Sequence, residues 1–126
     1  MRTMMRAWLV TLLAILWTAA LAQAQVAGTY HLQRKGLSGT LTVQELAGGE
    51  IAFKVHTVAR ATQHTAEIEG KVRLENDVGV YEGEEGCRLV LKFYPDLRKA
   101  VLSGGDETCR YYMGAAAAVD GAYVKK

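Results

Sequence analysis

Residues 66–75 read AEIEGKVRLE and carry the clearest sign of the fold. Small or apolar residues stand at every second position, which are Ala66, Ile68, Gly70, Val72 and Leu74, and charged residues fill the positions between them. A period of two is typical of a β-strand, because successive side chains point to opposite faces of a sheet. The stretch therefore predicts an antiparallel strand with one buried and one solvated face.

The same alternation recurs along the chain. Apolar residues at alternate positions mark strands near residues 40–44, 51–56 and 87–94, where Val90 is the one apolar residue out of phase. Glycine-rich turns such as AGGE at 47–50 and SGGD at 103–106 separate such segments. The segment GAYV at 121–124 mirrors GTY at 28–30. We expect an all-β fold, a small antiparallel β-barrel of seven or eight strands, closed by pairing of its terminal strands.

The first 24 residues have the pattern of a secretory signal peptide. Arg2 and Arg6 precede a mostly apolar, uncharged run at 7–22, which ends in the cleavage motif Ala22-Gln23-Ala24. The run is short for a membrane span, which needs roughly 20 apolar residues. We expect residues 1–24 to be removed and residues 25–126 to form a single β-barrel domain. That domain is predicted to be periplasmic or secreted, with no membrane anchor after cleavage.

The charge of the chain argues against two classes of partner. It holds 15 Lys and Arg against 13 Asp and Glu, and the signal peptide carries two of the basic residues. The exported domain is therefore close to neutral. Nucleic acid and anionic membranes are normally bound through a clear basic cluster. We expect no nucleic-acid partner.

The chain has 2 cysteines, Cys87 and Cys109. An even number of cysteines in an exported domain favours one disulfide. Their spacing is far from the C-x-x-C pattern of redox enzymes. The bond is therefore expected to stabilise the fold rather than to react.

The sequence shows no arrangement of residues suited to catalysis. Ser38 and Ser103 stand beside glycines in predicted turns, outside any nucleophile-elbow pattern. His56 and His64 flank a turn predicted near Arg60, whose symmetry could bring them together. A metal site needs three or four ligands, and no third ligand is in phase with these two. We expect a protein that is not an enzyme, with no metal and no cofactor.

Two segments are candidates for a partner-binding site. Glu82, Glu84 and Glu85 lie in an acidic loop, and a loop of this charge can raise the association rate with a cationic partner. Tyr111 and Tyr112 form a tyrosine pair, and tyrosine is enriched in binding surfaces. After this pair, four consecutive alanines at 115–118 fit either a helical turn or a closely packed strand of small residues.

Several short motifs resemble those of small exported bacterial β-domains, some of them labelled lysozyme-inhibitor-like. The motifs are HTAEIEG at 64–70, Tyr81 followed by CRL at 87–89, CRYYMG at 109–114 and DGAY at 120–123. Such domains commonly carry cysteines where this chain has Ala66 and Met113. The resemblance implies that one disulfide is lost here and that Cys87 and Cys109 form the other.

The leading functional expectation is a non-enzymatic periplasmic binding protein that inhibits lysozyme or another cell-wall hydrolase. Export, the absence of a catalytic arrangement and the acidic and tyrosine-bearing segments favour it. One alternative is a small-molecule carrier of the lipocalin or avidin type, since Gly28-Thr29-Tyr30 opens a meander of hairpins. The other is an immunity or structural protein of the cell envelope.

Overall fold

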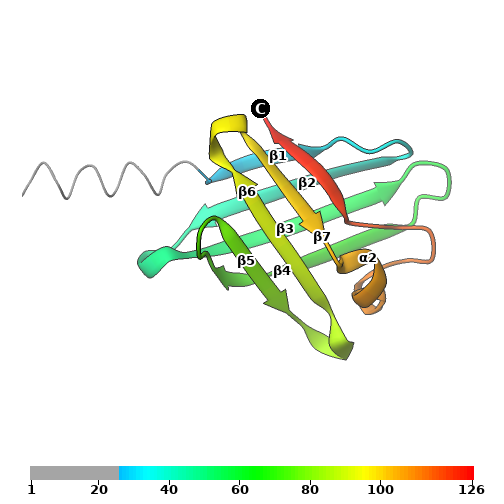
Figure 1. Cartoon of the computed structure of the whole chain (residues 1–126). Coiled ribbons are helices and arrows are strands. Elements are labelled where there is room, and N and C mark those ends of the chain that lie inside the picture. Colours follow the sequence, from blue (N-terminus) through cyan, green and yellow to red (C-terminus); the bar gives the residue numbers. More distant parts are fainter. Residues whose placement is uncertain (1–25) are drawn as a thin grey trace, which may run out of the picture.

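The computed structural model describes residues 26–126, so the predicted signal peptide lies outside the described residues. Eight strands make up most of this part (Figure 1). They are β1 (Gly28–Leu32), β2 (Leu37–Glu45), β3 (Glu50–Ala59), β4 (Thr65–Arg73), β5 (Val78–Glu82), β6 (Arg88–Tyr94), β7 (Lys99–Ser103) and β8 (Gly121–Lys125). One short helix, α2 (Gly105–Thr108), follows β7. No helix in residues 26–126 is long and apolar enough to cross a membrane.

All eight strands belong to one antiparallel sheet in the order β4-β3-β2-β1-β8-β7-β6-β5. The first and last strands pair, with Tyr30 opposite Lys125 and Leu32 opposite Tyr123. This pairing confirms the expected contact between the terminal segments. The sheet curls into a small, nearly closed barrel, and its two end strands, β4 and β5, meet at a seam. The predicted fold class is therefore confirmed.

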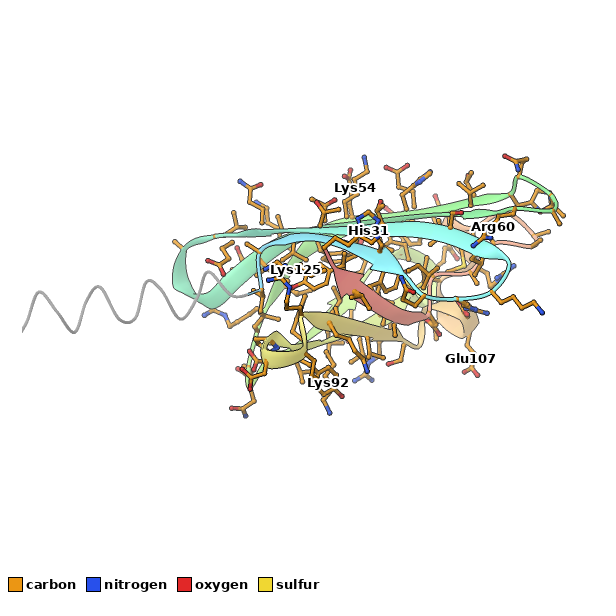
Figure 2. All side chains as sticks on the ribbon, turned by 90° about the horizontal axis from the view of Figure 1, so that it is seen from above. His31, Lys54, Arg60, Lys92, Glu107 and Lys125 are labelled. Atoms are coloured by element: carbon orange, nitrogen blue, oxygen red, sulfur yellow. A yellow bond between two sulfur atoms is a disulfide. The ribbon has the colours of Figure 1, made fainter. Side chains whose placement is uncertain are left out.

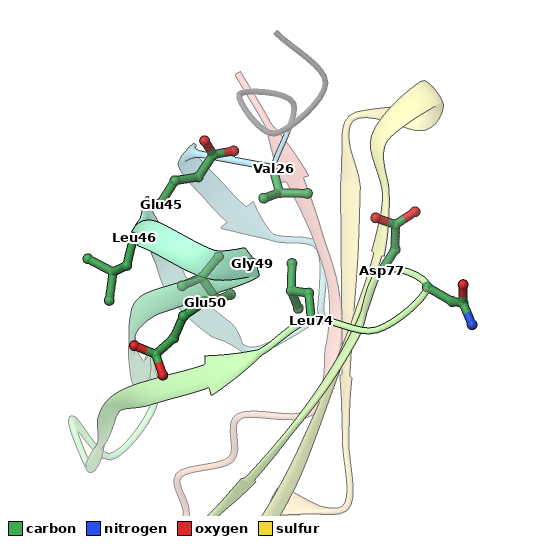
Figure 3. Close-up of a pocket in the computed structure, with 9 residues that line it drawn as sticks. Val26, Glu45, Leu46, Gly49, Glu50, Leu74 and Asp77 are labelled. Carbon is green, nitrogen blue, oxygen red and sulfur yellow. The ribbon is translucent and has the colours of Figure 1, made fainter. Parts of the chain in front are cut away.

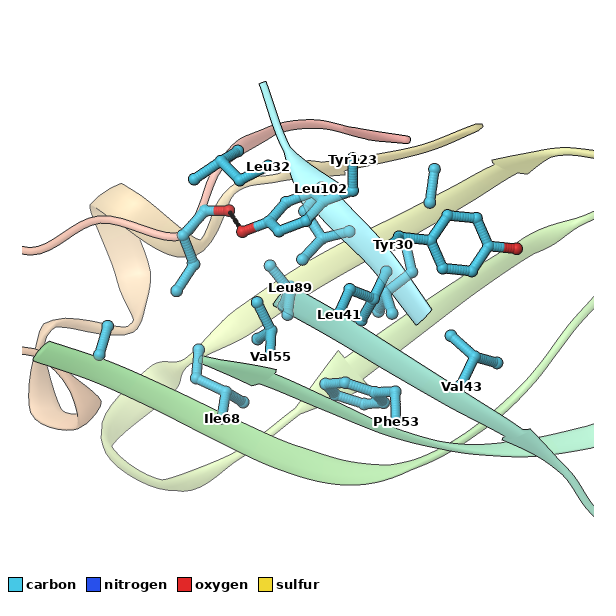
Figure 4. Packing of buried hydrophobic residues seen from close by; sticks show 14 of the residues in the cluster. Tyr30, Leu32, Leu41, Val43, Phe53, Val55, Ile68, Leu89, Leu102 and Tyr123 are labelled. Atoms are coloured by element: carbon cyan, nitrogen blue, oxygen red, sulfur yellow. Dashed lines mark hydrogen bonds between the residues drawn. The ribbon is translucent and has the colours of Figure 1, made fainter. Parts of the chain in front are cut away.

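The inward positions of the strands fill the barrel with side chains (Figure 4). Leu41, Val55, Ile68, Leu89 and Leu91 have no exposed surface. Aromatic rings and buried hydrogen bonds complete the packing. The Tyr30 and Phe93 rings meet edge to face, and the hydroxyls of Tyr30 and Tyr123 donate to the carbonyls of Val26 (2.7 Å) and Val119 (2.6 Å). The predicted alternation of buried and solvated residues is borne out in these strands, and the interior holds core rather than an open lumen.

The seam between β4 and β5 is closed by side chains and a loop rather than by a continuous ladder. A Cβ atom at Gly70 would lie 2.5 Å from the Tyr81 ring, and one at Gly79 would lie 2.7 Å from Val72. Glycine at both positions therefore lets the two strands approach closely. At the start of β4, an isolated bridge pairs Ala66 with Met113 and covers the edge.

The alanine-rich segment differs from both structures that its sequence allows. A helical turn is present, but it lies earlier, at Arg110–Tyr112. The alanines form a loop in which Ala117 and Ala118 are buried. The Arg110 guanidinium donates to the carbonyls of Ala115 (2.8 Å) and Ala117 (3.0 Å). These charged donors satisfy the loop carbonyls, so the segment needs no regular structure.

The structure does not bring His56 and His64 together. His56 pairs with Glu67 across β3 and β4, whereas the His64 carbonyl accepts from the Ala59 N–H at the end of the hairpin. The His64 ring turns to the alanine-rich loop, where its Nδ1 accepts from the Ala116 N–H at 3.0 Å. The register, with Val58 opposite Thr65, centres the hairpin between Ala61 and Thr62 rather than at Arg60, so His56 and His64 are not opposite each other.

Candidate functional site

The acidic loop connects β5 to β6. Glu82 ends β5, and a helical turn at Glu84–Gly86 leads into the next strand. Gly86 adopts a φ of +74°, a conformation that glycine reaches without steric cost, and this allows the tight reversal. The side chains of Glu82, Glu84 and Glu85 are exposed. The loop therefore presents three carboxylates to solvent.

The tyrosine pair lies on the segment that follows α2. Tyr111 and Tyr112 close the helical turn Arg110–Tyr112, and their rings meet edge to face with centroids 5.2 Å apart. Tyr111 is 62% exposed, whereas Tyr112 packs against the core cluster. The Tyr111 ring is thus exposed to solvent, while the Tyr112 ring is fixed by packing against the core.

The disulfide and a hydrogen bond join these two segments. Cys87, at the end of the acidic loop, is bonded to Cys109, just before the tyrosine pair. The Tyr112 hydroxyl accepts a hydrogen bond from the Glu84 N–H at 2.9 Å. The Thr108 hydroxyl accepts from the Arg88 N–H at 2.9 Å and so ties α2 to β6. The structure therefore brings the acidic loop and the tyrosine pair together, with Glu84 and Tyr112 in direct contact.

We call Glu82, Glu84, Glu85, Tyr111 and Tyr112 the acidic–tyrosine surface. Below it, Tyr81 is half-buried and packs on Phe53 with ring centroids 5.3 Å apart. Burial, followed by a hydrogen bond with Tyr112, raises the pKa of Tyr81. The Tyr81 hydroxyl therefore stays protonated at neutral pH and acts as a neutral hydrogen-bonding group.

A hydrogen-bond network of Asp106, Asp120 and Arg34 holds α2 in place. This network was not predicted from the sequence. Asp106 Oδ1 accepts from the N–H groups of Val119 (2.7 Å) and Asp120 (3.0 Å), and its Oδ2 accepts from Arg34 at 2.9 Å. The Asp120 carboxylate accepts in turn from the Gly105 N–H at 2.9 Å. The only local signal is an acidic residue in the first turn of a short helix. Arg34 is 72 residues away, and nothing in the sequence points to it.

These two carboxyl groups titrate differently. Burial alone would raise the pKa of Asp106, but the hydrogen bonds from Arg34 and from the two N–H groups outweigh burial and lower it. Burial raises the pKa of Asp120. The pair is fully occupied with holding the loop before β8 against α2, so we assign it a structural role.

A hollow of about 290 Å³ lies at the end of the barrel next to the β2–β3 turn (Figure 3). Its walls are mostly apolar and also carry the carboxylates of three acidic residues. The lining residues are Val26, Glu45, Leu46, Gly49, Glu50, Ile51, Leu74, Asn76 and Asp77. Burial raises the pKa of Glu45, against the positive charge of Lys125. The size is near the lower limit for sites that bind small molecules.

Within residues 26–126, no three His, Cys, Asp or Glu side chains are grouped so that they could hold a metal ion. The acidic–tyrosine surface offers carboxylates for cations and an exposed aromatic ring for apolar or cationic groups. In comparisons with protein-family models, curated proteins and solved structures, the chain matches none of them.

Proposed function

We propose that this chain is an exported, non-enzymatic binding protein of the periplasm that inhibits lysozyme or another cell-wall hydrolase. The observation that carries the proposal is the acidic–tyrosine surface, in which the Cys87–Cys109 bond and the Tyr112–Glu84 hydrogen bond hold two loops as one unit. A surface that is already ordered loses little conformational entropy on binding. Such loops suit a protein that must block a cleft without changing shape.

The chemistry of the surface favours a cationic partner. Glu82, Glu84 and Glu85 place three negative charges on one loop, and complementary charge speeds association. Tyr111, which is 62% exposed beside them, offers a rigid aromatic side chain of the kind that dominates binding energy at interfaces. A cationic cell-wall hydrolase fits both features.

One geometric feature supports the resemblance to lysozyme-inhibitor-like domains. Ala66 and Met113 stand where such domains commonly carry cysteines, and here they are directly opposite each other in a β-bridge. Cβ atoms of directly opposed residues are about 4.5–5.5 Å apart, which is close to the span of a disulfide. Loss of a second disulfide at this place would leave the arrangement that is seen.

Inhibition assays on a panel of purified lysozymes test the proposal. We expect the oxidised protein, residues 25–126, to inhibit at least one of them in a saturable way. Glu84→Lys with Glu85→Lys should weaken that inhibition by more than about tenfold, because two attractive charges become repulsive. Tyr111→Ala should weaken it by a similar factor.

The matched control carries the same change of charge elsewhere. Glu75→Lys with Asp96→Lys alters two exposed residues outside the acidic–tyrosine surface and should leave inhibition unchanged. If every lysozyme stays fully active in excess protein, the inhibitor function is excluded. A cognate toxin captured from an envelope extract would instead identify an immunity protein.

The hollow at the barrel end favours a second candidate, a carrier of small molecules. Because core side chains fill the barrel, a ligand would have to sit in the 290 Å³ hollow beside Glu45 and Leu74. Thermal-shift measurements with biotin and lipophilic dyes test this candidate. A ligand that raises the melting temperature of the wild type but not of Leu74→Trp, which fills the hollow, would establish it. No shift with any ligand would reject it.

A further inference from the structure

The outer faces of the two halves of the barrel differ in chemistry. On β5 to β8 the outward positions include five valines: Val78, Val80, Val90, Val101 and Val124. The outward positions of β2 to β4 are mostly polar or charged, among them Thr42, Lys54, Glu67, Glu69 and Lys71, with Val58 as the one outward valine there. Figure 2 shows Lys54 and Lys92 pointing away from the barrel on opposite sides. Most of the outward valines thus lie on the half of the barrel formed by β5 to β8.

The most exposed of these valines lies on an end strand of the sheet. Val80 is 41% exposed, and β5 is the last strand in the sheet order. Directly opposite it on β6 stands Val90, the residue out of phase with the inward alternation of its strand. Neighbouring apolar side chains on a solvated sheet face are typical of a contact site rather than of a free surface. We call Val78, Val80, Val90 and their neighbours Glu82, Arg88 and Lys92 the β5–β6 face.

The charges on the β5–β6 face are arranged so that the face complements itself. Along the two strands the outward pairs are Val78 with Lys92, Val80 with Val90, and Glu82 with Arg88. Consider two copies with their β5–β6 faces together, related by a two-fold axis that runs parallel to the strands, between the copies and above the line midway between β5 and β6. Under this symmetry, β5 of each copy lies against β6 of the other. The axis places each Val80 against the second copy's Val90, and each Glu82 against the second copy's Arg88. The aliphatic stem of Lys92 then covers Val78.

We propose that the β5–β6 face is the contact of a homodimer with two-fold symmetry. The arrangement satisfies the requirement of an isologous interface, in which one patch must complement itself. Its apolar centre and charged rim match the usual composition of protein interfaces. The proposal does not depend on the inhibitor function: the two surfaces share only Glu82, and Glu84, Glu85, Tyr111 and Tyr112 are outside the β5–β6 face.

Sedimentation velocity on residues 25–126, over a concentration range from about 1 to 500 µM, measures the association. We expect a reversible monomer–dimer equilibrium. Val80→Glu should weaken the dimer by more than about tenfold, because a charge without a partner would be buried at its centre. Thr42→Glu, the same charge at an exposed outward position of β2, should not change the equilibrium. Far-ultraviolet circular dichroism confirms that each variant is folded.

A charge exchange makes the test specific to this geometry. Glu82→Arg and Arg88→Glu should each weaken the dimer by about tenfold, and the double variant should restore it. A wild type that remains monomeric at every concentration overturns the proposal, as does a dimer that Val80→Glu leaves unchanged. Binding of a monomeric wild type to vesicles of anionic phospholipid, lost in Lys92→Glu, would assign the face to a membrane surface instead.

Discussion

Replacing both Cys87 and Cys109 with alanine is expected to lower the free energy of unfolding by about 3 kcal/mol. The bond closes a loop between residues 22 positions apart, and its loss lets the unfolded chain regain that freedom. Both cysteines are buried, so the change also leaves small gaps in the core. For a domain of this size, the melting temperature should fall by roughly 10–20 °C. Urea unfolding of the two proteins at neutral pH measures the difference.

The reducing agent dithiothreitol provides the control for the double variant. It should destabilise the wild type by a similar amount and leave the variant unaffected. The double variant should also bind the target hydrolase more weakly, because only the Tyr112–Glu84 hydrogen bond and the Thr108 contacts would still hold the acidic loop beside the tyrosine pair. A loss of less than about 1 kcal/mol would show that the loop is already ordered by its other contacts.

Asp106→Ala is expected to cost about 3 kcal/mol of stability at pH 7. The substitution leaves the N–H groups of Val119 and Asp120 without their acceptor and removes the ion pair with Arg34. Hydrogen bonds to a charged group contribute about 1.5–3 kcal/mol each when buried, and less where solvent reaches the pair, as it does at Arg34. Thermal and urea unfolding measure the loss, with Glu107→Ala as the control because the neighbouring Glu107 is exposed.

The two aspartates should also differ in how they respond to acid. Because the native state lowers the pKa of Asp106, its contribution is fully present above the ordinary value of 3.8 and is lost as the pH falls below it. Burial raises the pKa of Asp120, so the charged carboxylate destabilises the native state at neutral pH. Protonation of Asp120, which begins above its ordinary value of 3.8 in the native state, removes this destabilisation. Asp120→Asn should therefore be at least as stable as the wild type at pH 7. A variant clearly less stable than the wild type would contradict this assignment.

The barrel could be predicted because each strand carries a local pattern of alternating apolar and polar residues. In β4 and β6 every second residue is buried, and a period of two leaves one arrangement in which the apolar residues share a face. Val90 broke that period, and the structure shows it on the outer face. The turn of the β3–β4 hairpin was predicted near Arg60 and lies at residues 60–62, but its exact register could not be predicted because the turn has no glycine or proline. Gln63 adopts a φ of +62° there, which the sequence does not reveal.

The candidate site could be predicted only in part, because its contacts join distant segments. Glu84 and Tyr112 are 28 residues apart, and no local pattern predicts their hydrogen bond. The cysteines supply the one available signal: Cys87 follows Glu84 by three residues, and Cys109 precedes Tyr112 by three. The network of Asp106, Asp120 and Arg34 had no such signal. It depends on an irregular loop whose path is set by Arg110 and by packing, not by strand periodicity.

The order of the strands has a consequence for the topology of folding. Read around the sheet from β5, through β8 and β1, to β4, every strand is followed by its antiparallel neighbour. Because the consecutive strands β4 and β5 also meet at the seam, the barrel is a simple eight-strand meander whose first and last strands pair. The ladder between Tyr30 and Lys125 is the one strand pairing in residues 26–126 that joins the two ends of the domain, and it raises the contact order. Until the last strand has been synthesised, the paired strands form two parts, one of four strands (β1 to β4) and one of three (β5 to β7).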